Sequence, residues 1–227
     1  MIYFLLGSCL GSFLCVVAQR VPLQQDFIFS RSKCDSCQKV LRPWEMIPLF
    51  SCLLLKFRCQ RCGGKIPAAF WLAELIYGGL FYFCWLQPTL KEKLIALLWL
   101  TTVFLLSLTD WFYFIVEPKI LYPLHALLWG MMLYFKQPFY WTTVGTVVLL
   151  AAVLLVTLKD SMGLGDWLLL GLWAPWLSPL EFSQLLFAAS SCALVFFGLY
   201  FLIQKKRLQR LPFVPFLSLG LLLVYFI

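Results

Sequence analysis

Long apolar segments dominate this chain and restrict the folds that it can adopt. Among its 227 residues, 63% are hydrophobic and only 12% are charged, and the mean hydropathy is +0.90. Lipid is the solvent in which so apolar a surface is stable, and a helix crosses a bilayer with about 20 such residues. The sequence therefore predicts an all-α, polytopic integral membrane protein, built as a bundle of transmembrane helices.

We expect about eight transmembrane helices and one long polar loop at residues 19–67. The segments 166–180 and 212–227 are short for a complete crossing, so a count of seven remains open. The first segment lacks a basic start and a clear cleavage site, which favours a retained helix over a signal peptide. The expected helices are 1–18, 68–87, 93–110, 117–135, 140–158, 166–180, 183–203 and 212–227.

Lysines and arginines are distributed unevenly between the two sides of this expected bundle. The loop 19–67 carries nine of the 18, and with eight spans it shares its side with Lys119, Lys159 and the basic run 205–210. Only three lysines lie on the other side. The positive-inside rule then places the loop in the cytosol. Because the charges flank the spans, we expect anionic membrane lipids, and no nucleic acid, to balance the net charge of +8.

Two Cys-x-x-Cys pairs, 21 residues apart, lie in the same loop. Each pair places two thiolates on one turn, as a tetrahedral four-cysteine site requires, and disulfides rarely persist in the cytosol. Gly63 and Gly64 follow the second pair and allow the positive φ angles that such turns often need. The pattern favours a structural zinc, with four free thiols as the alternative. The proposed ligands are Cys34, Cys37, Cys59 and Cys62.

Three acidic residues fall within or at the edges of apolar segments, namely Glu74, Asp110 and Asp166. Charge is costly in a membrane, so each is a candidate functional residue. Asp110 and Asp166 are expected on the cytosolic side, where two carboxylates that share a proton can activate water and protonate a carbonyl oxygen. Gly163 and Gly165 would let a substrate backbone approach Asp166 closely. The alternative is that each aspartate caps a helix or lies in headgroup water.

An ordered set of motifs covers nearly the whole chain and resembles the type IV prepilin peptidases, a class of GxGD intramembrane aspartyl peptidases. The second aspartate motif reads Gly-Leu-Gly-Asp at 163–166. Two positions depart from the usual family pattern: residues 115–118 read Ile-Val-Glu-Pro, and Leu168 stands where lysine is common. These departures suggest a divergent branch, such as one that processes competence pseudopilins. The other matching segments are Leu6–Val17 with Arg20-Val21-Pro22, the two cysteine pairs, Ile47–Ser51, Glu74 and Asp110.

The resemblance implies a specific activity at a bacterial plasma membrane. Such enzymes remove the basic leader of prepilins or pseudopilins at the cytosolic face, and here Asp110 and Asp166 would be catalytic. Relatives with the cysteine loop commonly also methylate the new amino terminus with S-adenosylmethionine. Glu74 and Arg20 are then candidates for methyl transfer or for contact with the loop. The implied division is an amino-terminal region, 1–92, that carries the loop, and a peptidase domain, 93–227.

Two other functions remain open from the residues alone. A membrane thiol oxidoreductase would use the cysteine pairs and would not need Asp110 or Asp166. A transporter with a zinc-stabilised cytosolic cap would use the membrane carboxylates to move protons or cations. His125, the single histidine, cannot build a metal site alone, and we expect it to be a hydrogen-bonded packing residue.

Overall fold

The computed structural model describes residues 1–28, 32–34, 36–157, 163–205 and 211–226. Within these residues the regular elements are helices, and the β interactions are two isolated bridges. The chain forms two compact units, Met1–Thr101 and Thr102–Ile227, which are described separately below. The predicted all-helical class is confirmed.

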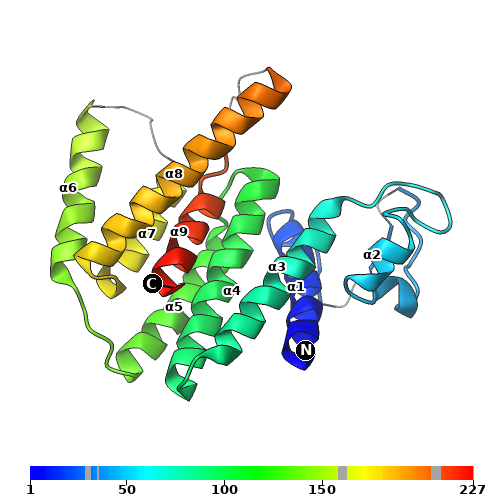
Figure 1. Ribbon diagram of the computed structural model, residues 1–227, viewed down its shortest axis with the longest axis horizontal. Helices are drawn as coiled ribbons and strands as arrows, with labels where there is room; N and C mark the ends of the chain where they lie inside the picture. Colours follow the sequence, from blue (N-terminus) through cyan, green and yellow to red (C-terminus); the bar gives the residue numbers. More distant parts are fainter. Residues whose placement is uncertain (29–31, 35, 158–162, 206–210, 227) are drawn as a thin grey trace. The chain divides into compact units, whose positions relative to one another are not determined.

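The first unit is built on two apolar helices, α1 (Ile2–Arg20) and α3 (Ala68–Leu86), which lie side by side in Figure 1. The helices are antiparallel, since Gly7 lies against Gly78 whereas Gly11 lies against Tyr77. A methyl group at Gly11 would come within 2.8 Å of Tyr77 Cβ and 2.9 Å of the Ala73 carbonyl oxygen. Close approach of the backbones therefore requires glycine there, and Gly7 and Gly11 have the Gly-x-x-x-Gly spacing found where membrane helices pack closely.

The polar loop between these helices contains two short elements, the 3₁₀ helix η1 (Pro43–Met46) and the helix α2 (Phe50–Leu54). Leu49 precedes α2 with a φ of 65°, which is uncommon for a bulky residue. Its amide N–H is nevertheless paired, because it donates to Glu74 Oε2 on α3 at 2.7 Å. The loop is thus tied to a membrane helix at a defined point.

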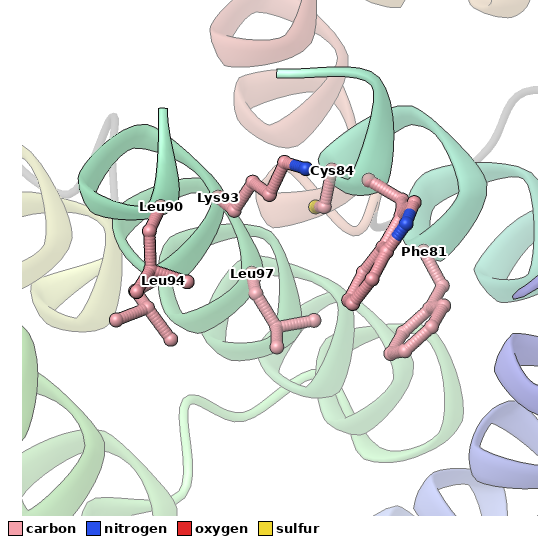
Figure 2. Close-up of a pocket in the computed structure, with 7 residues that line it drawn as sticks. Phe81, Cys84, Leu90, Lys93, Leu94 and Leu97 are labelled. Atoms are coloured by element: carbon pink, nitrogen blue, oxygen red, sulfur yellow. The ribbon is translucent and has the colours of Figure 1, made fainter. Parts of the chain in front are cut away.

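A shallow apolar hollow lies where α3 ends and α4 (Leu90–Tyr113) begins (Figure 2). Lys93 extends across it, with Nζ 5.0 Å from the centroid of the Trp85 ring. Its walls are otherwise aromatic and aliphatic side chains and the Cys84 thiol. The lining residues are Phe81, Cys84, Trp85, Leu90, Lys93, Leu94 and Leu97.

Where the structure describes it, the second unit comprises the second half of α4 and five further α-helices. Helices α8 and α9 pack closely, since Gly220 of α9 lies against the backbone of Leu185 on α8. Trp173, Leu169 and Leu170 on α7 are fully buried and form part of the core. The elements are α5 (Pro118–Tyr134), α6 (Trp141–Thr157), α7 (Leu164–Trp173), the 3₁₀ helix η2 (Ala174–Trp176), α8 (Pro179–Gln204) and α9 (Val214–Phe226).

Each of the eight expected apolar segments contains an α-helix in the part of the chain that the structure describes. Four of these helices, α1, α3, α4 and α8, are long and apolar enough to cross a membrane, which supports a membrane protein. α7 ends at Trp173 because Pro175 follows and cannot continue the helix. Whether the shorter helices cross the bilayer remains a prediction. Arg31, Lys159 and residues 206–210, which entered the charge argument, lie outside the described residues.

Candidate active site and metal centre

Asp110 occupies the last turn of α4 and is 7% exposed. Its Oδ2 accepts a hydrogen bond from the Val214 N–H at 3.0 Å, and the Phe213 amide also donates to this carboxylate. Both amides lie at the amino-terminal end of α9, where backbone donors have no partner within the helix. Asp110 therefore caps a helix that follows it by about 100 residues in the chain, as the capping alternative allowed, although the sequence did not indicate which helix.

Asp166 lies in the first turn of α7 and is half-buried. The N-cap of this helix is Gly163, so Asp166 is not the cap residue itself. Its amide donates to the Gly163 carbonyl oxygen at 3.1 Å, and the Gly163 amide donates to the Asp166 carboxylate. The negative charge of Asp110 acts on Asp166, so the fold brings the two carboxylates within electrostatic reach.

Gly165 lets the start of α7, which carries Asp166, lie close to the segment that follows Asp110. A Cβ atom at residue 165 would lie 2.6 Å from Val116 Cγ2 and 2.9 Å from Val116 Cβ, distances that real contacts do not reach. Val116 belongs to the turn between α4 and α5, just after Asp110. The missing side chain thus lets the start of α7 pack against the segment that follows the first aspartate. A role for Gly163 or Gly165 in admitting substrate stays a prediction.

The other end of α7 is fixed by hydrogen bonds from α5. Trp173 Nε1 donates to His125 Nε2 at 3.0 Å, and His125 Nδ1 donates to the Leu121 carbonyl oxygen at 2.9 Å. Trp129 Nε1 donates to the Leu172 carbonyl oxygen at 3.1 Å. His125 is 2% exposed, which confirms the expected packing role. These contacts orient α7 and therefore the aspartate at its start.

The four loop cysteines form a compact cluster in the first unit. Their sulfur atoms lie within 4.8 Å of one another, and Cys34 Sγ is 3.8 Å from Cys62 Sγ. Four sulfurs at the usual Zn–S distance of about 2.3 Å are roughly 3.8 Å apart in a tetrahedron. The cluster therefore fits a thiophilic metal ion without rearrangement of the backbone.

The two cysteine turns repeat one backbone pattern. In the first, the Gln38 amide donates to the Cys34 carbonyl oxygen, and in the second the Gly63 amide donates to that of Cys59. Gln38 and Gly63 both adopt positive φ, at 56° and 69°. Each turn closes with an isolated bridge, Lys33 with Val40 and Arg58 with Lys65.

Gly64 allows the two turns to approach each other. A Cβ atom there would lie 2.6 Å from Ser36 Oγ and 3.2 Å from Cys62 Sγ. The expectation of a positive φ thus holds for Gly63, whereas Gly64 provides space. Backbone amides of Cys62 and Arg61 direct hydrogen bonds at the Cys59 sulfur and lower its pKa to about 7, which favours the thiolate that a metal requires.

Glu74 and Arg20 flank the root of the loop. Glu74 is 5% exposed, and its carboxylate accepts hydrogen bonds from the Leu49 amide and the Ser12 side chain. Among the described residues, its contact with the loop is therefore made to the Leu49 backbone. Arg20 Nη1 donates to the Asp26 carbonyl oxygen at 3.1 Å, which closes the turn after α1.

Two family models match consecutive parts of this chain. The bacterial peptidase A24 N-terminal domain matches residues 5–88, and the type IV leader peptidase family matches residues 94–199. The first match contains the cysteine cluster, and the second contains both aspartates. The chain belongs to the type IV leader peptidase family.

Curated relatives agree with this assignment. A protein of Aeromonas salmonicida named prepilin leader peptidase/N-methyltransferase is 30% identical over 96% of this chain and 87% of its own. One of the same name from Bacillus subtilis is 28% identical over 99% of this chain and 92% of its own. A Myxococcus xanthus protein with that name is 49% identical, but the match covers only 36% of this chain and 24% of the relative. No solved structure matches the chain.

Proposed function

We propose that this protein is a prepilin leader peptidase, which removes the leader from prepilins or pseudopilins. The observation that carries the proposal is the convergence of Asp110 and Asp166, from α4 and α7, inside the segment that matches the leader peptidase family. Relatives along almost the whole chain are named for the same activity. Neither a thiol oxidoreductase nor a transporter would account for two converging aspartates in a segment that matches the leader peptidase family.

The two carboxylates act as one acid–base unit. The ionised member accepts a proton from water, whose oxygen attacks the scissile carbonyl carbon, while the protonated member donates to the carbonyl oxygen. On collapse of the tetrahedral intermediate the C–N bond breaks and the leaving amine takes the proton that the first carboxylate accepted from water. The second carboxylate recovers its proton from a hydroxyl group of the intermediate. Because the pair shares one proton, neither aspartate has a fixed role before substrate binds. Asp110 keeps its bonds to the α9 amides, which hold it in place.

The proposed location of the reaction follows from the charge distribution. The loop 19–67 lies in the cytosol, and the enzyme lies in the bacterial plasma membrane with its lipids around it. A prepilin leader is basic, so the cut falls where its charged segment meets its apolar helix. The four cysteines of the cluster would hold zinc, which would tie the two turns together and take no part in cleavage.

Methylation of the new amino terminus is the second proposed activity, and the relatives' names favour it. S-adenosylmethionine would supply the methyl group when bound. The Glu74 carboxylate already accepts the Leu49 amide and the Ser12 side chain, so Glu74 supports this activity by holding the loop. Arg20, at the root of the loop, is the proposed contact for the donor's carboxylate.

The test is co-expression with a pilin precursor that carries a basic leader, a glycine and an apolar helix. Mass spectrometry of the pilin should show loss of the leader with wild-type enzyme. An intact leader with well-inserted wild-type enzyme would contradict the proposed peptidase activity.

The same experiment with Glu74→Gln separates the two reactions. A neutral amide accepts the Leu49 N–H less strongly than a carboxylate does. We expect full cleavage but at least a severalfold smaller methylated fraction. If Glu74→Gln and wild type give equal methylation, the loop anchor has no part in methyl transfer.

A further inference from the structure

The segment from η1 to α2 exposes an unusual number of large apolar side chains for a polar loop. Leu54 is 80% exposed, and the neighbouring apolar residues range from 44% to 56%. Soluble surfaces seldom gather so many apolar side chains in one short segment. We propose that residues 44–54 lie in the membrane interface, with their apolar side chains at the boundary between headgroups and acyl chains. The exposed residues are Trp44, Met46, Ile47, Phe50, Leu53 and Leu54.

The depth of this segment is fixed by its contact with α3. Leu49, which starts α2, donates to Glu74, and Glu74 is the seventh residue of a helix that begins at Ala68. At 1.5 Å per residue, this contact lies about 9 Å along the α3 axis. α3 is apolar and long enough to span a membrane. The start of α2 therefore lies beside the first two turns of a membrane helix, not in the water beyond its end.

α2 has one face buried against the protein and one exposed apolar face, as a helix in the membrane interface requires. Ser51 and Cys52 are buried against the protein, whereas Phe50, Leu53 and Leu54 point away from it. A second contact holds the chain just after the segment beside the first turn of α3, because the rings of Phe57 and Trp71 meet edge to face with centroids 6.2 Å apart. Lipid, which surrounds α3, is then the solvent next to the exposed side chains. Interfacial helices bury their apolar face about 5–10 Å into the headgroup region.

Charged residues around the segment identify the lipid as anionic. Arg42 stacks on Trp44, with Cζ 5.3 Å from the ring centroid, and Lys56 and Arg58 are exposed just after α2. Aromatic rings and long basic side chains together suit the headgroup level, where the rings and methylene stems contact lipid and the charges reach phosphate. With five residues, α2 is far too short to cross the bilayer. The segment therefore lies in one leaflet and anchors the cysteine cluster at the membrane surface.

The test uses the full-length protein in vesicles that contain a phospholipid with a photoreactive diazirine in its acyl chain. After illumination, mass spectrometry locates the labelled peptides. We expect residues 44–54 to carry about tenfold more label than residues 58–65, which include the second cysteine turn and serve as the internal control. The labelling should increase when phosphatidylglycerol replaces part of the phosphatidylcholine. The combined variant Lys56→Gln, Arg58→Gln should lose this increase.

A second variant tests whether labelling depends on the apolar side chains, with metal content as the check that the loop still folds. Leu53→Gln with Leu54→Gln should reduce the labelling of residues 44–54 severalfold while the metal content of the protein stays unchanged. Equal labelling of 44–54 and 58–65 would overturn the proposal. It would also be overturned if 44–54 were shielded from both the lipid probe and water-borne hydroxyl radicals, since a protein partner or a second copy would then cover the surface.

Discussion

At the scale of single residues, each proposed catalytic aspartate is held by backbone donors as well as by its own helix. Asp110 caps α9, and Asp166 is bonded to the Gly163 amide. An asparagine at either position keeps an acceptor for these amides but cannot exchange the proton that the reaction needs. Loss of chemistry can therefore be separated from loss of structure at both positions.

The close approach of Gly165 to Val116 predicts the effect of a substitution at residue 165. Gly165→Ala should reduce leader cleavage at least tenfold, because the new methyl group would overlap Val116 and displace the start of α7. Adding Val116→Ala should restore much of the activity, as measured by the initial rate of cleavage. Among the described residues, a Cβ atom at Gly163 would meet Asp166 Oδ2 at an ordinary contact distance of 3.4 Å, so Gly163→Ala should leave the fold intact. If Val116→Ala restores nothing, the space at Gly165 serves the substrate instead.

At the scale of elements, α7 is positioned from both ends, at Gly165 by Val116 and at Trp173 by His125. The sequence predicted the helices well, because apolar segments of this length leave few alternatives in a membrane. It also located the cysteine turns, since their spacing reflects metal geometry. It did not reveal that Asp110 caps α9 or that His125 accepts from Trp173. These contacts join residues 48 to 104 positions apart, and no local pattern records them.

The His125–Trp173 bond predicts a positioning effect on catalysis. His125→Phe leaves the buried Trp173 N–H without its acceptor, at a cost of about 1–3 kcal/mol. We expect a lower melting temperature, and a fall in kcat with little change in KM, because α7 carries Asp166. His125→Gln keeps an acceptor and should recover part of kcat. A fall in stability with unchanged kcat would show that the bond supports the fold only.

At the scale of the whole molecule, the chain combines two compact units, for which we propose separate tasks. The first unit carries the cysteine cluster and the loop anchor at Glu74, and the second carries both aspartates. The two family-model matches, 5–88 and 94–199, meet a few residues before the boundary between the units. The division at residues 92 and 93 that the resemblance implied stays a prediction. Such an arrangement lets metal loss affect one activity more than the other.

Metal removal tests this separation. Purified protein should contain about one zinc per chain, and the pair Cys34→Ser, Cys37→Ser should abolish it by removing two of four ligands. Proteolysis of the loop should become faster, because binding energy in such clusters is folding energy. Leader cleavage should persist in part. A metal-free wild-type protein with a disulfide between the cysteines would contradict both the zinc site and the cytosolic orientation.

The most direct test of the account is leader cleavage by Asp110→Asn and Asp166→Asn, each co-expressed with the same pilin precursor. Glu92→Gln, an exposed acid at the other end of α4, is the matched control. We predict that each aspartate variant inserts normally into the membrane and leaves the leader intact, while Glu92→Gln cleaves as wild type does. Complete cleavage by either aspartate variant would contradict the two-carboxylate mechanism.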